Sequence, residues 1–131
     1  MTPANRQMPK SILLVDDDRS HLQMLALHLR IAGFRVQTAS GGEQALGLLR
    51  AKRYDCLLTD AEMSPLDGFE LCREAGRIDP RLRLIMISGA HLERCIAGLR
   101  IEKFFPKPLP LDQLVGWISS APAEARLDGA S

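Results

Sequence analysis

Four short apolar runs in the chain are each followed closely by a side chain that can take part in a reaction or bind a ligand. The run ILLV is followed by three consecutive carboxylates, Asp16 to Asp18, and the run LLT is followed by Asp60. Ser88 comes directly after LIMI, and Lys107 stands between two prolines just after FF. Adjacent carboxylates repel one another. The three aspartates are therefore either solvated charge at the start of a helix or ligands of a cation.

A cation and a phosphoryl group together account for all of these residue types. Hard carboxylate oxygens suit Mg²⁺, which uses one or two of them and keeps bound water and phosphate oxygens. A carboxylate can also act as a nucleophile and form an acyl phosphate. The hydroxyl of Ser88 and the ammonium of Lys107 can contact the remaining phosphoryl oxygens, and such positioning is most of what phosphoryl transfer requires. The set predicts phosphoryl transfer to an aspartate in the presence of Mg²⁺.

The elements that would position these residues alternate along the chain. Apolar runs rich in branched residues predict short strands, and apolar residues at helical spacing predict helices between them. Gly33 is expected to end the first helix, and the S-x-x-E pattern from Ser40 to Glu43 predicts a capping box at the second. The expected strands are residues 11–15, 34–38, 55–59, 82–87 and 104–105, and the expected helices lie around 22–29, 43–49, 69–75, 92–99 and 111–118.

Five strand–helix repeats predict an α/β fold. Continuous apolar strands joined by helices imply a parallel sheet that is covered on both faces. Right-handed crossovers leave the doubly wound folds, and five strands favour the flavodoxin-like strand order 2-1-3-4-5. The first and third strands are neighbours in that order. The carboxylates of Asp16, Asp17 and Asp60 are therefore expected to converge in one crevice at the carboxyl ends of the strands.

Composition narrows the class of protein. A chain of 131 residues suffices for one domain, and 46% hydrophobic with 25% charged residues is ordinary for a globular protein. Seventeen basic residues nearly balance sixteen acidic ones, so no excess positive charge favours nucleic acid or an anionic membrane. No apolar run is long enough to cross a bilayer, and the first residues lack the apolar segment of a secretory signal. Three cysteines without a CxxC pair fit free thiols in the cytoplasm.

The motifs together resemble those of response-regulator receiver domains of two-component signalling. ILLVDDD resembles the family's first strand and acidic pair, and YDCLLTDAEMSPLDGFEL resembles the strand that bears the phosphoacceptor. LIMISGA resembles the strand ending in Ser or Thr, and FFPKPL resembles the Lys-Pro strand. The resemblance implies a bacterial response regulator that takes a phosphoryl group from a phosphohistidine of a sensor kinase or phosphotransfer protein. We expect the receiver domain over residues 11–119, an N-terminal tail over 1–10 and a disordered tail over 120–131.

Carried over residue by residue, the resemblance gives each site residue a role. It implies that Asp60 is phosphorylated and that Ser88 and Lys107 contact the phosphoryl group. It implies that Mg²⁺ is bound directly by Asp17, Asp60 and the backbone carbonyl of Glu62. Asp16 would bind the metal largely through water.

The resemblance also implies a route from the site to a partner protein. Phe104 stands where the family has its switch aromatic, three residues before the lysine. Phosphorylation would then alter the face formed by the helix near 92–99, the strand at 104–105 and the helix at 111–118, where a downstream protein binds. The span from Ser88 to Lys107 is shorter than is usual in the family, so the helix near 92–99 is expected to be trimmed or irregular.

Plainer interpretations stand beside these. Asp18, with Ser20, fits the start of the first helix better than a metal site. His21, His28 and His91 lack metal-ligand spacing and are expected to be surface or helix residues. For the whole chain, one alternative is a receiver-like interaction module that is not phosphorylated. Another is a small phosphatase that uses an aspartate nucleophile and a second acid two residues later.

Overall fold

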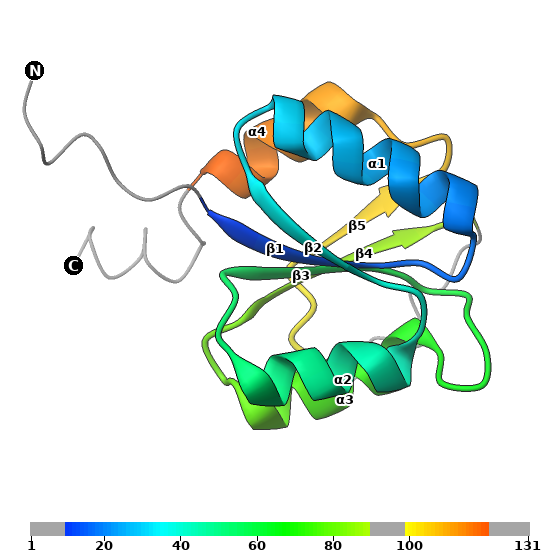
Figure 1. Ribbon diagram of the computed structural model, residues 1–131, viewed down its shortest axis with the longest axis vertical. Helices are drawn as coiled ribbons and strands as arrows, with labels where there is room; N and C mark the ends of the chain where they lie inside the picture. Colours follow the sequence, from blue (N-terminus) through cyan, green and yellow to red (C-terminus); the bar gives the residue numbers. More distant parts are fainter. Residues whose placement is uncertain (1–9, 90–98, 121–131) are drawn as a thin grey trace, which may run out of the picture.

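A parallel sheet of five strands lies between two layers of helices in the computed structural model, which describes residues 10–89 and 99–120 (Figure 1). The strands lie in the order β2-β1-β3-β4-β5, and every neighbouring pair is parallel. This confirms the predicted α/β fold and its flavodoxin-like strand order. The strands are β1 (Ser11–Val15), β2 (Arg35–Ala39), β3 (Cys56–Asp60), β4 (Arg83–Ser88) and β5 (Lys103–Pro106).

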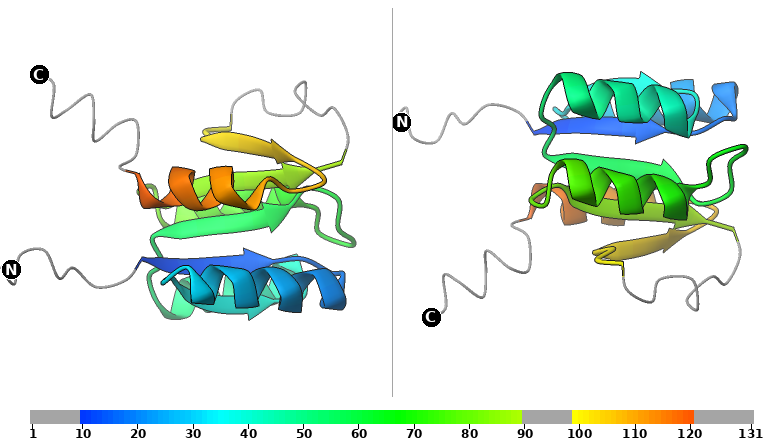
Figure 2. Two further views of the ribbon diagram at one scale, coloured as in Figure 1. Left: turned by 90° about the horizontal axis from the view of Figure 1, so that it is seen from above. Right: turned by 90° about the horizontal axis from the view of Figure 1, so that it is seen from below.

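Of the helices that the structure describes, two cover each face of the sheet. Helices α1 and α4 lie over one face and α2 and α3 over the other, as the views from above and below show (Figure 2). The helix predicted near 92–99 falls almost wholly outside the described residues, as do most of the two predicted tails. The described helices are α1 (Arg19–Ile31), α2 (Gly42–Ala51), α3 (Gly68–Ile78) and α4 (Leu111–Ser119).

The strands are buried on both faces because their side chains alternate between two hydrophobic cores. One core joins α1 and α4 to the sheet, and the other joins α2 and α3 to it. The strand residues in the first core are Ile12, Leu14, Cys56, Leu58, Ile85, Ile87 and Phe105. Those in the second are Leu13, Val15, Ala39, Leu57, Leu84 and Met86.

The starts of the helices confirm one prediction and correct another. Asp18 is the N-cap of α1, as expected, and its side chain accepts the His21 N–H at 3.2 Å. The capping box predicted from Ser40 to Glu43 is wrong. The N-cap of α2 is Gly41, which has no side chain to accept a hydrogen bond, and Ser40 donates to the Gln44 side chain instead.

The capping box in this structure lies at α3. The Asp67 side chain accepts the Glu70 N–H at 2.9 Å, and the Glu70 side chain accepts the Asp67 N–H at 3.1 Å. These two bonds satisfy backbone donors that the helix itself cannot pair. They fix the start of the helix that follows the phosphoacceptor-like strand β3.

Three strands begin and end one residue later than predicted. The predicted ranges 34–38, 55–59 and 82–87 become Arg35–Ala39, Cys56–Asp60 and Arg83–Ser88. The prediction followed apolar side chains, whereas the backbone ladder continues through the polar residue that ends each of the last two strands, Asp60 and Ser88. Both polar residues are therefore held by the sheet itself.

Among the described helices, none combines the length and apolar character needed to cross a membrane.

Candidate functional site

The register of the sheet brings the predicted site residues to one edge. Val15 pairs with Thr59, so the next residues along β1 and β3 are Asp16 and Asp60. Asp60 in turn pairs with Ile87, one residue before Ser88. Ser88 pairs with Pro106, one residue before Lys107. The tertiary structure therefore gathers these residues at the carboxyl ends of four strands, as expected.

Three carboxylates form a cluster in this crevice. Asp16, Asp17 and Asp60 can each offer one oxygen such that all three oxygens lie within 4.8 Å of one another. Asp16 and Asp60 are only 3% and 5% exposed, whereas Asp17 is exposed. Oxygens so close together in a partly buried site suit a small hard cation.

Asp60 has an environment that fits a ligand. Its Oδ1 atom is buried and makes no hydrogen bond within the described structure, although the Lys107 Nζ atom lies 3.3 Å away as an ion pair. Burial raises the pKa of the Asp60 carboxyl above its ordinary value; the Lys107 ammonium opposes this shift, and the nearby Asp16 carboxylate adds to it. A buried carboxylate oxygen whose ion-pair partner in the described structure is a single ammonium at 3.3 Å is one that a cation or a phosphoryl group can engage. The residues present therefore fit a divalent metal such as Mg²⁺.

Ser88 and Lys107 close the crevice on the far side of Asp60. Ser88 is buried at the end of β4, and its carbonyl oxygen accepts the Lys107 N–H at 3.1 Å. The Lys107 side chain is 36% exposed, so its ammonium reaches Asp60 from the surface. Glu62 is exposed in the loop after β3, and its carbonyl remains a predicted ligand only.

Helix α3 begins directly against the phosphoacceptor-like residue. A Cβ atom added to Gly68 would lie 2.4 Å from the Asp60 carbonyl oxygen and 2.8 Å from the Ala61 Cα atom. Only glycine allows this approach, and the Gly68 N–H donates to the Ala61 carbonyl at 2.9 Å. Asp67 and Gly68 thus do more than make a turn, because they seat α3 against the end of β3.

His21 is a residue of the site that the sequence prediction missed. Its Nδ1 atom lies 2.5 Å from the Asp16 Oδ2 atom, and the imidazole is partly buried. The prediction considered histidine only as a metal ligand and found no spacing for it. The available signal was its position in the first turn of the helix that Asp18 caps, where a side chain can turn back toward the strand end.

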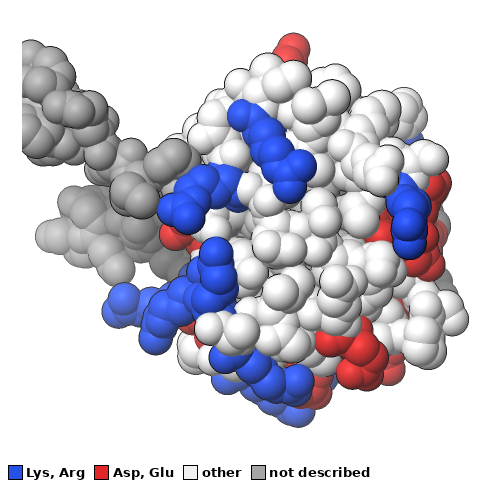
Figure 3. Space-filling model, viewed as in Figure 1, with Lys and Arg blue, Asp and Glu red and all other residues white. Residues whose placement is uncertain are grey.

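Charged side chains are unevenly distributed over the face shown in Figure 3. In Figure 3, Lys and Arg gather mainly at the left and lower left, the end of the sheet where the strands begin. Asp and Glu show at the right, toward the end where the strands finish and the carboxylate cluster lies. The crevice at the strand ends is thus the more acidic end in this view, which favours a cation there.

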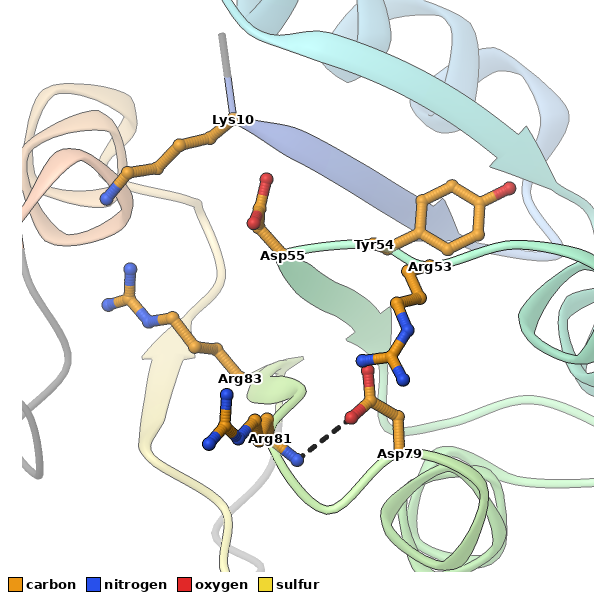
Figure 4. A pocket seen from close by; sticks show the side chains of 7 residues that line it. All are labelled: Lys10, Arg53, Tyr54, Asp55, Asp79, Arg81 and Arg83. Atoms are coloured by element: carbon orange, nitrogen blue, oxygen red, sulfur yellow. Dashed lines mark hydrogen bonds between the residues drawn. The ribbon is translucent and has the colours of Figure 1, made fainter. Parts of the chain in front are cut away.

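A second charged pocket, of about 340 Å³, lies at the opposite end of the sheet (Figure 4). The carboxylate of Asp55 accepts the Ser11 N–H at 2.7 Å, and Asp79 accepts the Arg81 N–H at 3.0 Å. Arg83 is paired with Glu102 and with backbone carbonyls of α4. These charges hold chain segments together, and none belongs to the predicted site. The pocket is lined by Lys10, Arg53, Tyr54, Asp55, Asp79, Arg81 and Arg83.

The two described cysteines take no part in the site. Cys56 and Cys72 are free and buried, on the two opposite faces of the sheet. Burial raises the pKa of each thiol to about 12, so both stay protonated and unreactive near neutral pH. Cys56 is a small buried hydrophobic residue, as expected.

Comparison with known proteins decides the family. The family model described as "Response regulator receiver domain" matches residues 12–119. The chain belongs to this family. A receiver domain is a signalling module rather than a dedicated enzyme, and receiver domains interact with kinases and downstream targets. The resemblance stated from the motifs is confirmed.

Individual relatives share the receiver over only part of their length. The chain is 37% identical over 119 residues to the transcriptional regulatory protein ZraR of Klebsiella oxytoca, covering 88% of this chain and 27% of ZraR. It is 33% identical over 111 residues to the response regulator MprA of Mycolicibacterium vanbaalenii, and this match covers 82% of this chain and 48% of MprA. The chain therefore spans about a quarter to a half of the length of these curated relatives.

The fold agrees with a solved receiver domain over nearly its whole length. A response regulator receiver domain protein from Clostridium thermocellum superposes with a TM-score of 0.80 and is 28% identical. The match covers 90% of this chain and 98% of that one. The acidic cluster of this receiver therefore lies on the scaffold of an established signalling fold.

Proposed function

We propose that this receiver accepts a phosphoryl group on Asp60 from a phosphohistidine of a sensor kinase or a phosphotransfer protein. The observation that carries the proposal is the buried Asp60 Oδ1 atom, which has no hydrogen bond and lies 3.3 Å from the Lys107 ammonium. The metal would be Mg²⁺, held directly by Asp17, Asp60 and the Glu62 carbonyl and largely through water by Asp16. The cluster of oxygens within 4.8 Å supports this assignment.

The transfer is a single displacement at phosphorus. A carboxylate oxygen of Asp60 forms the new O–P bond as the P–N bond to the donor imidazole breaks. The bonding electron pair leaves with the imidazole nitrogen, and the product on Asp60 is an acyl phosphate. When bound, the metal compensates negative charge that would otherwise keep an anionic phosphoryl group away from three carboxylates.

Ser88 and Lys107 would hold the transferred group. Ser88 ends β4, which lies beside β3, and Lys107 follows β5, the next strand; the Lys107 N–H is already bonded to the Ser88 carbonyl. Movement of either side chain toward the phosphoryl group would therefore be transmitted to β5. Phe104, on β5, packs with its ring centroid 6.2 Å from that of Phe69 on α3. Phe104 would pass the change to the face formed by β5, α4 and the segment before β5, as its place three residues before the lysine in the family motif implies.

An apolar surface beside the site suits the donor protein. Met24, Leu27 and Ile31 on α1 are 51%, 56% and 75% exposed, and their spacing of three and four residues places them on one side of the helix. A groove of about 350 Å³ runs between α1 and the loop after β5, and His21 and Lys107 are among its lining residues. A donor bound along α1 would therefore place its phosphohistidine near the crevice.

The test is phosphorylation by a small donor. The protein is incubated with acetyl phosphate or phosphoramidate, with and without Mg²⁺, and its intact mass is measured. We expect one added phosphoryl group that requires Mg²⁺ and is absent from Asp60→Asn. Asp112→Asn, which changes an exposed carboxylate on α4, is the matched control and should behave like the wild type.

Two results would speak against the proposal. Undiminished incorporation in Asp60→Asn would place the modification on another residue. No incorporation in the wild type with either donor would favour the receiver-like interaction module that is not phosphorylated.

A further inference from the structure

His21 holds Asp16 in a fixed position. The Asp16 Oδ2 atom lies 2.5 Å from the His21 Nδ1 atom, and its Oδ1 atom accepts the Asp18 N–H at 2.9 Å. An ionised carboxylate can only accept hydrogen bonds, so the imidazole donates from Nδ1. Both oxygens of Asp16 are thus engaged by the protein.

The first turn of α1 fixes His21 in turn. Its backbone N–H donates to the Asp18 side chain, the N-cap of the helix, at 3.2 Å. The same residue is therefore anchored through its backbone to Asp18 and through its ring to Asp16. The imidazole can leave Asp16 only by changing its side-chain rotamer.

The three carboxylates consequently differ in what they can offer a cation. Asp17 is exposed, and its side chain makes no hydrogen bond or ion pair that the described structure contains. Asp60 has one oxygen without a hydrogen bond. Each oxygen of Asp16 already accepts one hydrogen bond while His21 is in place, so a cation bound directly by Asp16 would compete with these donors. Two carboxylates are therefore open for direct ligation, whereas direct ligation by the third competes with the His21 imidazole and the Asp18 N–H.

We propose that His21 is a positioning residue that sets the cation preference of this site by keeping Asp16 from ligating the metal directly. Mg²⁺ is bound through one or two carboxylates and keeps several waters, whereas Ca²⁺ takes six to eight oxygen ligands in flexible geometry. A site with two open carboxylates suits Mg²⁺, and release of the third would favour Ca²⁺. This inference rests on the proposed metal site of the phosphoacceptor.

The test compares the dissociation constants for Mg²⁺ and Ca²⁺, each titrated calorimetrically into metal-free protein. His21→Leu removes the donor and frees Asp16. We expect Ca²⁺ affinity to rise relative to Mg²⁺ affinity by about fivefold, which corresponds to about 1 kcal/mol. His21→Asn places an amide N–H near the position of Nδ1 and should keep the wild-type ratio. His21→Ala repeats the measurement if His21→Leu does not fold.

A matched control lies on the same helix. The His28 ring is bonded to the Met24 carbonyl at 2.9 Å rather than to a carboxylate, so His28→Leu should leave the ratio unchanged. An unchanged ratio in His21→Leu, or equal weakening of both metals, would overturn the inference while leaving the metal site intact. Failure of the wild type to bind either metal, or unchanged binding in Asp17→Asn, would overturn the proposed metal site and this inference with it.

Discussion

The three aspartates at the strand ends have the same side chain but lie in three different environments. Asp17 is exposed, Asp16 is buried and held by His21, and Asp60 is buried with an oxygen that lacks a hydrogen bond. Lys107 offsets only part of the charge, because burial still raises the pKa of Asp60. Without a bound cation the site therefore costs the fold stability, as sites shaped for ligands often do.

The cost at Asp60 predicts how stability depends on pH. The folded pKa of Asp60 is raised above its ordinary value of 3.8, so ionising this residue is harder in the folded than in the unfolded protein. The contribution of Asp60 to stability is thus greatest below that ordinary value and is lost as the pH rises through the folded pKa. In the presence of EDTA at pH 7, Asp60→Asn should be more stable than the wild type by on the order of 1 kcal/mol.

Urea unfolding at several pH values checks this expectation. The advantage of Asp60→Asn should shrink as the pH falls toward 3.8 and should be reduced or reversed at pH 7 by Mg²⁺, which only the wild type binds fully. Asp17→Asn, which changes an exposed carboxylate of the same cluster, should show a smaller gain. A wild type as stable as Asp60→Asn at pH 7 without metal would contradict the argument.

At the scale of elements, a buried arginine fastens α4 to the sheet. Arg83 is 6% exposed at the start of β4 and pairs with Glu102 just before β5. Its guanidinium also donates to the carbonyls of Trp117 and Ile118, at 3.0 and 2.9 Å. These carbonyls belong to the last turn of α4, where the regular helical hydrogen bonds end. Arg83 thus caps the C-terminal end of α4 and joins this helix to β4 and to the start of β5.

Loss of this guanidinium should be costly. Arg83→Met removes the guanidinium from the partly buried Glu102 carboxylate and from two helix carbonyls, so we expect the free energy of unfolding to fall by about 3 kcal/mol. Arg81→Met is the matched control. Arg81 is exposed two residues earlier, and its loss should change stability by less than about 0.5 kcal/mol. Equal urea midpoints for the two variants would show that the Arg83 contacts contribute little.

At the scale of the whole molecule, the sheet has one end at which α4 is fastened and an opposite end at which the candidate site residues lie. Arg83 and Lys10 bind the end of α4 near the starts of the strands, with the Lys10 Nζ atom 3.1 Å from the Ile118 carbonyl. The acidic cluster, Ser88 and Lys107 lie where the strands finish. We therefore expect a change at the carboxyl ends of the strands to reach β5 and the start of α4, while the far end of α4 stays fastened.

Lys107 is the link this arrangement predicts. Lys107→Ala should still permit phosphorylation, because the metal compensates much of the charge, but it should weaken the change passed to β5. The measurement is the shift of backbone amides from Lys103 to Leu109 and along α4 on addition of the phosphoryl mimic beryllofluoride. We expect these shifts to fall by at least about half in Lys107→Ala and to persist in Lys103→Ala, whose ammonium lies over the Trp117 ring instead.

Wild-type shifts in Lys107→Ala across that segment would show that Lys107 is an ordinary loop lysine. Loss of phosphorylation itself in this variant would show that the ammonium serves the chemistry rather than the coupling.

The sequence by itself determined the fold and all but one of the residues assigned to the candidate site, His21 being the exception. Continuous apolar runs separated by helical spacing allow few arrangements other than a covered parallel sheet, and the chemical side chains come at the ends of those runs. Asp16, Asp17, Asp60, Ser88 and Lys107 could be placed at one edge because the ends of parallel strands coincide whatever the detailed packing. Such patterns depend on near neighbours along the chain, and these are visible in the sequence.

Only the tertiary structure decided which partners the polar side chains take. The S-x-x-E pattern at Ser40 was locally sufficient for a capping box, yet Gln44 takes the hydrogen bonds, and the box forms at Asp67. His21 bonds Asp16, and Arg83 finds Glu102 nineteen residues along the chain. Each choice depends on side-chain rotamers and on distances between elements that meet only after folding. A residue's type shows what it can bind, and the packed geometry selects the partner among several that are chemically equivalent.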